Sequence, residues 1–317
     1  MAGLRMTVAD FVPIARGIER PEDIVVAPGG EVYASEHRCC VARLEADGGF
    51  TRLGPAGGAP NGLAMDRTGR IVVANFGIYD RAAGPLQRFD PRTGVHETLV
   101  AEIEGRRLTS CNYPLVADDG TIWCTHSTFA DTWPQALDGR PDGFVFALLP
   151  SGEVKVAARG LRFPNGCALS ADGRHLYVCQ TSAANVLRFP VHGPGELGPP
   201  EPFGPVLGPL LEGPVDPARP PPLQIAQHLG YTDGCGFDAE GNLWVTLPAA
   251  NKIVAIHPDG SVTTVVHDPE GQVVDHPTNV EWGGPDLRDL YVGSIRAAYV
   301  LKARSPVPGQ PKVHQRP

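Results

Sequence analysis

The chain of 317 residues carries a formal net charge of −8, and only 20% of its residues are charged. An acidic chain offers no electrostatic attraction to nucleic-acid phosphates or anionic membranes, so a small molecule or a cation is the expected ligand. Glycine (38) and proline (33) together exceed a fifth of the residues, which leaves few uninterrupted runs for long helices. The composition therefore favours a packed, turn-rich, all-β protein that binds neither nucleic acid nor membrane.

The location of the protein is suggested by what its sequence lacks. It has no run of about 18 apolar residues, and the apolar run near its start is too short for a signal-peptide core. Seven cysteines without a CxxC pair indicate neither a disulfide framework nor a zinc site of that type. We expect a cytoplasmic protein whose thiols are reduced and mostly buried.

One pattern recurs six times along the chain: a polar corner, an apolar alternation, a turn with glycine and a second apolar run. The copies begin at Pro21, Pro60, Cys111, Pro164, Thr232 and Pro277. Each copy predicts a β-hairpin, and a second hairpin usually follows it, so a repeat holds four antiparallel strands. Roughly 53 residues per repeat is the size of a four-stranded propeller blade. The sequence therefore predicts a six-bladed β-propeller, as a single domain over residues 1–317.

Three segments outside the repeats are informative. Residues 11–18 are similar to the segment that precedes the fourth copy, so we expect them to be the outer strand that closes the last blade. The connection 126–142 carries aromatic residues and could be a lid over the site or a plain loop. Residues 191–223 are dense in proline and glycine, and we expect a surface insertion there.

The corner before each inner strand carries one side chain with an oxygen. These are Glu22, Asn61, Asn112, Asn165, Asp233 and Asn279. Equivalent corners of a propeller converge at one end of its channel, and carboxylate and amide oxygens suit a hard cation such as Ca²⁺. Asn61 and Asn279 are also explained as ordinary turn residues. Glu22, Asn165 and Asp233 are the candidate metal ligands, because two carboxylates match the charge of a dication.

The corner motifs resemble a known family. They are PE at 21–22, PNG at 164–166 before CALSADGRHLYV, DG at 233–234 before CGFDAEGNLWV, and PTNVEWGGPDLRDLYV from Pro277. Their order and spacing resemble the regucalcin/gluconolactonase/luciferin-regenerating-enzyme family, the senescence-marker-protein-like propeller hydrolases, over residues 15–303. In that family, and in the similar diisopropyl fluorophosphatase, a Glu, one or two Asn and an Asp at these corners hold a catalytic divalent cation.

The resemblance implies roles for individual residues. Glu22, Asn165 and Asp233 would hold one divalent metal ion, with Asn112 as a fourth ligand or a substrate contact. Ca²⁺ is the favoured ion, with Zn²⁺, Mn²⁺, Mg²⁺ and Fe²⁺ as alternatives. Asp233 would be the catalytic residue, either as a general base or as a nucleophile. Asn61 lies in a PNG motif found in gluconolactonase-like members and would contact the substrate.

The chain departs from the family at the third corner. Gluconolactonase-like members usually have Asn-Asp there and Thr-Asp-Pro after the next strand, whereas this chain has Asn-Tyr at 112–113 and Thr-His-Ser at 125–127. We expect Tyr113, His126 and Trp133 to contact the substrate. The rim of the pocket would then be more aromatic and less acidic than that of a sugar-lactone site.

The expected function is that of a metal-dependent lactonase, a gluconolactonase-like hydrolase of carboxylic ester bonds that opens a sugar lactone or a less polar lactone. Two alternatives use the same site. One is a non-catalytic propeller that is stabilised by the cation and binds a ligand or a protein partner at the channel mouth. The other is a phosphotriesterase or aryl esterase, which Ile295 disfavours because diisopropyl fluorophosphatase has a histidine at that position.

Overall fold

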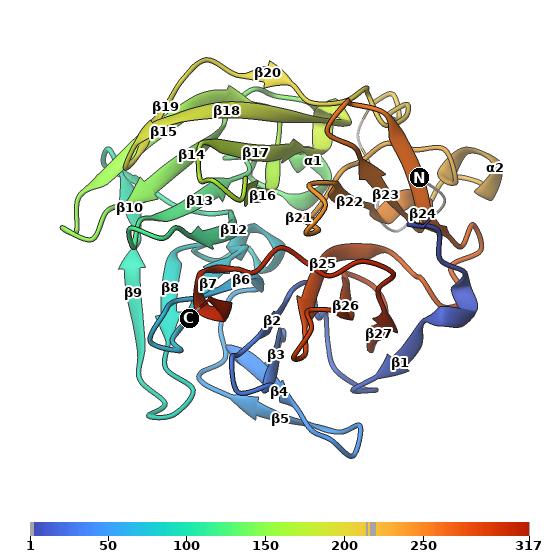
Figure 1. Ribbon diagram of the computed structural model, residues 1–317. Coiled ribbons are helices and arrows are strands. Elements are labelled where there is room, and N and C mark those ends of the chain that lie inside the picture. The colour runs from blue at the N-terminus through green and yellow to red at the C-terminus, as the bar shows by residue number, and fades with distance from the viewer. Residues whose placement is uncertain (1–2, 214, 216–219, 317) are drawn as a thin grey trace.

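Antiparallel sheets around a central channel make up most of the computed structural model, which describes residues 3–213, 215 and 220–316. Six of the sheets have four or five strands and form the blades, and a further two-stranded sheet lies outside them. Figure 1 shows the blades arranged around the channel in chain order. The six-bladed β-propeller predicted from the repeats is confirmed.

The strands of each blade run outward from the channel. Blade one is β2 (Ile24–Val26), β3 (Val32–Ser35), β4 (Val41–Leu44) and β5 (Phe50–Leu53). Blade two is β6 (Pro60–Met65), β7 (Ile71–Asn75), β8 (Leu86–Phe89) and β9 (His96–Val100). Blade three is β12 (Cys111–Val116), β13 (Ile122–His126), β14 (Gly143–Leu148) and β15 (Val154–Leu161). The small sheet is β10 (Glu102–Ile103) with β11 (Arg106–Arg107).

The last three blades follow the same order. Blade four is β16 (Pro164–Leu169), β17 (His175–Gln180) and β18 (Asn185–Gly193), edged by β19 (Glu196–Leu197) and β20 (Glu201–Pro202). Blade five is β21 (Cys235–Phe237), β22 (Leu243–Leu247), β23 (Lys252–Ile256) and β24 (Val262–His267). Blade six is β25 (Pro277–Gly283), β26 (Asp289–Ser294) and β27 (Val300–Arg304), completed by β1 (Val12–Ile14).

The N-terminal strand closes the propeller, as predicted. β1 pairs antiparallel with β27, with Val12 opposite Lys302 and Ile14 opposite Val300. The first strand of the chain is thus the outer strand of the last blade (Figure 1). This pairing covers the edge that β27 would otherwise expose.

The two irregular connections take different forms. The segment 191–223 begins in β18, adds β19 and β20 to the edge of blade four, and then runs to α2 (Leu223–Ala226). Residues 214 and 216–219 of this insertion lie outside the described residues. The connection 126–142 contains α1 (Trp133–Ala136). Within the described residues, no helix is long and apolar enough to cross a membrane, and the cytoplasmic location stays a prediction.

The same side-chain to backbone hydrogen bonds recur in the turns that follow the inner strands of blades two and five. In blade two, Asp66 Oδ1 accepts hydrogen bonds from the backbone N–H groups of Thr68 (2.8 Å) and Arg70 (3.1 Å). Gly69 in this turn has a φ of +81°, a conformation that side chains disfavour. The DAEG turn of blade five repeats this arrangement around Asp238. These local bonds fix the register in which the inner strands pair.

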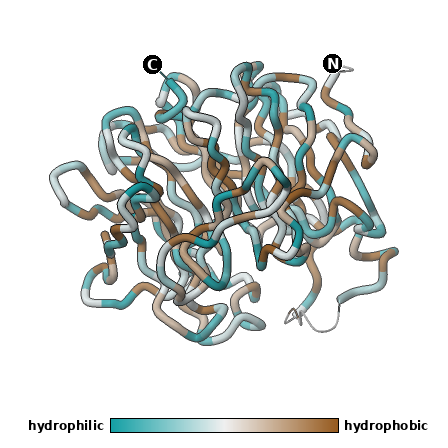
Figure 2. Tube along the Cα trace, turned by 90° about the horizontal axis from the view of Figure 1, so that it is seen from below, coloured by the Kyte–Doolittle hydropathy of each residue, from teal (hydrophilic) through white to brown (hydrophobic). Residues whose placement is uncertain are grey.

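The hydrophobic core lies between neighbouring blades. Trp244 of blade five and Trp282 of blade six pack edge to face, with ring centroids 5.2 Å apart. Cys167 and Cys235 are buried between inner strands, as predicted for small core residues, and all seven cysteines are free and buried. Figure 2 shows apolar stretches recurring along the trace of the blades, with hydrophilic residues at many of the loops.

The C-terminal segment, residues 305–316, crosses the end of the channel opposite to the corners. Gln310 N–H donates to a carbonyl of β21 (2.9 Å), and its side-chain amide donates to a carbonyl of β16 (3.0 Å). Gln315 donates to a carbonyl of β25 (2.8 Å), and His314 bonds a carbonyl of β2 (3.0 Å). The segment therefore straps four blades together, independently of β1.

Lys312 extends from this strap into the channel. Its Nζ lies 2.5 Å from Oε2 of Glu281, whose side chain is only 1% exposed. Burial raises the pKa of Glu281, and the Lys312 ammonium opposes that shift. Burial also disfavours a charged lysine, but the carboxylates of Glu281 and Asp23 raise the pKa of Lys312. Lys312 is therefore a fixed cation inside the propeller.

Replacing Lys312 by methionine should lower the free energy of unfolding by about 2–4 kcal/mol, because it leaves the Glu281 carboxylate buried without a partner. Adding Glu281→Gln should recover part of the loss. Urea denaturation of the two single variants and the double variant measures this coupling. Lys302→Met removes a surface lysine paired with Asp289 and should change stability by less than about 0.5 kcal/mol. A Lys312→Met variant as stable as Lys302→Met would contradict the assignment.

Candidate metal and active site

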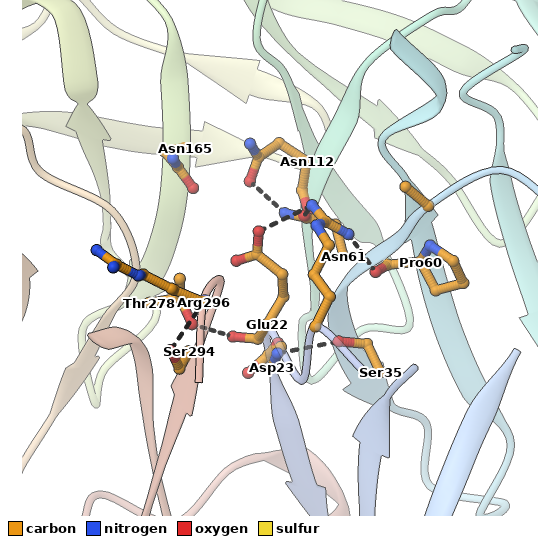
Figure 3. A network of polar contacts seen from close by, with 12 residues as sticks. Glu22, Asp23, Ser35, Pro60, Asn61, Asn112, Asn165, Thr278, Ser294 and Arg296 are labelled. Atoms are coloured by element: carbon orange, nitrogen blue, oxygen red, sulfur yellow. Dashed lines mark hydrogen bonds and ion pairs between the residues drawn. The ribbon is translucent and has the colours of Figure 1, made fainter. Parts of the chain in front are cut away.

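The corners that precede the inner strands bring Glu22, Asn61, Asn112, Asn165 and Asp233 to one end of the channel. Figure 3 shows the first four of these side chains gathered from four blades around a common space. Glu22 (5% exposed), Asn112 (3%) and Asn165 (5%) are buried, and Asp233 is partly exposed. The convergence expected from the repeat is present for these five residues.

Hydrogen bonds orient the amide side chains. Asn165 Nδ2 donates to the Thr181 hydroxyl (3.1 Å), so its Oδ1 is left without a donor among the described residues. Asn61 Nδ2 donates to the carbonyl (3.3 Å) and to the Oδ1 (3.2 Å) of Asn112. Asn61 therefore fixes the orientation of the Asn112 amide. The Nδ2 of Asn112 donates to no described residue.

Arg20 is a member of the site that the sequence analysis did not identify. Its Nη2 donates to Glu22 Oε1 (2.8 Å) and to Asn61 Oδ1 (2.6 Å), and its Nη1 donates to the Pro60 carbonyl (3.0 Å). The guanidinium thus ties the first corner to the second. One oxygen of Glu22 is engaged by Arg20, while its other oxygen has no hydrogen-bond donor among the described residues.

Four carboxylates, those of Glu22, Asp23, Asp233 and Glu281, lie in or at the mouth of the channel. Burial raises the pKa of each of them, that of Asp23 to about 7. For Asp233, the negative charge of Glu22 raises the pKa further. Among the described residues, Arg20 pairs with Glu22 and Lys312 pairs with Glu281, so two negative charges are left over when all four groups are ionised.

The excess negative charge and the donor atoms at the corners show whether a metal ion fits this site. Two uncompensated charges call for one dication, and the oxygens of Glu22, Asp233 and Asn165 are the hard donors that Ca²⁺ prefers. No group of three His, Cys, Asp or Glu side chains forms a metal cluster within the described residues. The donors here are instead two carboxylates and amides, and this set fits a divalent cation.

A second layer of side chains crosses the channel below the corners. Asn279 Nδ2 donates to Asp23 Oδ1 and to the Tyr113 hydroxyl (3.1 Å). Asp23 Oδ2 accepts the backbone N–H of Leu63 (2.6 Å). Gly234 leaves the space for this layer, since a Cβ there would collide with Asn279 Oδ1. The layer closes the channel beneath the candidate metal site.

Asn279 is not a corner residue, contrary to the sequence prediction. In blade six Pro277 and Val280 pair with β26, as Pro164 and Cys167 pair with β17 in blade four. Thr278 is therefore the equivalent of Asn165, and Asn279 lies one residue deeper. The Thr278 hydroxyl donates to the backbone carbonyl of Glu22 (2.6 Å), which joins the last corner to the first.

Tyr113 also lies in the second layer and not on the rim. It is 4% exposed, and its hydroxyl accepts a hydrogen bond from Asn279 across the channel. It occupies the place that glycine takes after Asn61, Asn165 and Asp233. A direct contact with a substrate at the mouth is therefore not supported for Tyr113.

His126 is a buried structural residue in this fold. Its ring stacks on Phe144 (centroids 4.7 Å apart) and lies 4.3 Å from Phe129. Nε2 accepts backbone N–H groups from Thr109 (3.3 Å) and Ser110 (3.2 Å). Burial lowers the pKa of His126 to about 3, helped by the charge of Arg106. The side chain of His126 is therefore not exposed at the channel mouth.

Trp133 lies in an aromatic cluster near the corners. Its ring centroid is 5.7 Å from that of Phe76, 6.1 Å from Phe163 and 6.2 Å from Tyr79. Tyr79 in turn lies under the Arg20 guanidinium, 4.6 Å from ring to Cζ. The connection that carries Trp133 is therefore linked to the site through Tyr79 and Arg20.

A cavity of about 350 Å³ opens at the opposite end of the channel. Trp123, Phe237, Trp282 and Lys312 contribute to its lining, beside the C-terminal strap. It is separated from the corners by the layer that contains Tyr113. This cavity is therefore distinct from the candidate metal site, which lies at the other mouth of the channel.

Sequence reasoning missed Arg20, Asp23, Tyr79, Glu281 and Lys312. Arg20 and Asp23 flank the Pro-Glu corner, and their charges beside a proposed ligand were an available signal. Glu281 stands between Val280 and Trp282 in an inner strand whose residues are all buried, so a charge at that place in the sequence was an available signal. For Tyr79 and Lys312, nothing in the local sequence indicates the distant partner.

The fold and the site define a class of protein, a six-bladed propeller with carboxylate and amide oxygens gathered at one mouth of its channel. The family model described as SMP-30/Gluconolactonase/LRE-like region matches residues 82–296. The chain belongs to this family, and the resemblance drawn from its corner motifs is confirmed.

Individual relatives are distant. The chain is 26% identical to protein STRICTOSIDINE SYNTHASE-LIKE 6 of Arabidopsis thaliana over 255 residues, which is 77% of this chain and 60% of that protein. It is 28% identical to a gluconolactonase of Zymomonas mobilis over 216 residues, 67% of this chain and 55% of the relative. The solved structure of a calcium-binding protein, regucalcin from Agrobacterium tumefaciens, matches with a TM-score of 0.70 at 19% identity, covering 94% of each chain. The chain thus spans 60% or less of the lengths of these two curated relatives.

The burial of His126 predicts a specific pH dependence. Its pKa of about 3 in the folded protein lies below its ordinary value of 6.5, so acid favours the unfolded state, in which the imidazole takes a proton first. In His126→Gln, the amide oxygen can replace Nε2 as acceptor. The free energy of unfolding of the wild type should fall relative to this variant by about 1.4 kcal/mol per pH unit from about pH 6 to 4. A difference independent of pH would refute the assignment.

Proposed function

We propose that this protein is a metal-dependent lactonase whose active site is the mouth formed by the corners. Glu22, Asn165 and Asp233 would hold one divalent cation, with Asn112 as a further ligand or a substrate contact. The observation that carries the proposal is the gathering of corner oxygens that accept no hydrogen bond from the described residues, one from Glu22 and Oδ1 of Asn165, beside the Asp233 carboxylate. Arg20 pairs with only one oxygen of Glu22, and no ion pair among the described residues engages the Asp233 carboxylate.

The relatives support the choice of substrate and ion. One is named a gluconolactonase, which points to a sugar lactone or a related cyclic ester. The regucalcin structure is described as that of a calcium-binding protein, which supports Ca²⁺ as the favoured ion. Oxygen donors are also compatible with Mn²⁺ or Mg²⁺, while Zn²⁺ and Fe²⁺ more often take nitrogen or sulfur ligands.

The residues of the site supply the other requirements of ester hydrolysis. When bound, a divalent cation would polarise the lactone carbonyl and stabilise negative charge on its oxygen. Asp233 is partly exposed at the mouth, where its carboxylate can accept a proton from the attacking water. Attack by the Asp233 carboxylate itself on the carbonyl carbon is the alternative use of the same group.

Asn112 and Asn61 would act on the substrate side of the site. The Nδ2 of Asn112 donates to none of the residues that the structure describes and can donate to an oxygen of the lactone, and Asn61 holds that amide in place through Asn112 Oδ1 (3.2 Å). Tyr79 and Trp133 provide an aromatic surface next to the corners. Such a surface suits the apolar face of a sugar ring or of a less polar lactone.

The test is lactone hydrolysis, followed as proton release, on aldonolactones and alkyl lactones, with aryl esters and a phosphotriester as further substrates. We expect turnover of a lactone that stops after chelation and returns with Ca²⁺ or another single ion. Asp233→Ala should lower kcat by about 10³-fold or more while the circular dichroism spectrum is kept. Asp47→Ala, an exposed carboxylate in a turn of blade one, should have no effect.

Three outcomes would contradict this function. Wild-type rates in Asp233→Ala would remove the carboxylate from the chemistry. Hydrolysis of the aryl ester or phosphotriester alone would assign the site to another esterase class. No turnover of any substrate, together with a melting temperature that falls on chelation, would favour a binding propeller stabilised by its cation.

A further inference from the structure

Arg20 occupies a backbone position that favours glycine. Its φ is +52°, in the left-handed region, and it directly precedes Pro21. Phe163 and His276, which precede the corner prolines of blades four and six, share this conformation. A side chain is strained there and persists only where its surroundings hold it in place. The arginine is therefore kept at a position where glycine would be less strained.

The surroundings of Arg20 are specific to its charge. The residue is 7% exposed, and its guanidinium donates to Glu22, Asn61 and the Pro60 carbonyl. Its planar face lies 4.6 Å from the centre of the Tyr79 ring. Arg20 thus uses both the several N–H donors of its guanidinium and its flat cationic face. A lysine side chain has the charge but neither of these features.

The position of the charge has a consequence for any cation at the corners. Glu22 Oε1 accepts a hydrogen bond from Arg20, so part of the negative charge that would attract a dication is already engaged. A fixed positive charge beside a dication also repels it, and Arg20 and Glu22 are buried, so this repulsion is poorly screened. The number of charges around a cation is what tunes the affinity of oxygen sites.

We propose that Arg20 is a positioning residue that shares Glu22 with the metal ion and thereby weakens metal binding. This inference rests on the proposed function, because it requires a metal at the corners. With Arg20 present, the two ligand carboxylates donate less charge to the ion than two free carboxylates would. The link from Glu22 through Arg20 to Tyr79 also connects the ligand to the aromatic surface beside Trp133.

The test measures metal affinity directly, by titration calorimetry of the purified chain with Ca²⁺. Arg20→Met should bind Ca²⁺ about tenfold more tightly or better than the wild type, because the competing charge is gone. Arg20→Lys keeps the charge and should stay within about threefold of the wild-type affinity. Arg20→Gln, which is neutral but retains a donor, should follow the methionine variant and serves if that variant fails to fold.

Asp233→Asn separates failure of this inference from failure of the proposed site. It should weaken Ca²⁺ binding about tenfold or more, because it removes a ligand charge. If it does so while the neutral Arg20 variants bind Ca²⁺ equally or more weakly than the wild type, Arg20 only scaffolds Glu22 and the inference is wrong. If Asp233→Asn has no effect, or the wild type binds no Ca²⁺, the site itself is wrong. Tighter binding in Arg20→Met and Arg20→Gln, with wild-type affinity in Arg20→Lys, establishes the role.

Discussion

Buried charge in the channel is the constraint on which the rest of this structure depends. Four carboxylates lie in or at the mouth of the channel, and the described residues supply two cations from opposite ends, Arg20 at the corners and Lys312 from the C-terminal strap. Isolated ions are costly to bury, so such a cluster is stable only when its charges are balanced or when its acids take up protons. Burial raises the pKa of all four carboxyl groups, and the negative charge of Glu22 raises that of Asp233 further.

The fold gathers these oxygen donors at one mouth of the channel. Each inner strand begins at a corner, so donors from different blades meet at the same mouth without any loop having to reach across. The layer of Asp23, Tyr113 and Asn279 closes the channel beneath them and keeps the site at the surface. The strap at the other end supplies Lys312, which balances Glu281. The candidate site therefore has a rigid base beneath its open side.

Much of the fold and part of the site could be predicted from the sequence. The sixfold spacing and the glycine turns are local signals, and they predicted the blades, their closure by residues 11–18 and the gathering of corner oxygens at one mouth. Asn279 was predicted to be the corner residue of blade six because of its residue type. Pro277 sets the register of the strand, however, and makes Thr278 the corner residue.

The rest of the site depends on distant contacts. His126 looked like a rim residue because it ends a strand at the mouth, but two phenylalanine rings and two backbone N–H groups bury it. Lys312 is remote in sequence from Glu281, and no local pattern could have paired them. The most direct test of the account is the anomalous diffraction of crystals grown with Mn²⁺. The account predicts one strong peak about 2–2.6 Å from oxygens of Glu22, Asn165 and Asp233; a mouth without a peak, or a peak bound only elsewhere, would contradict it.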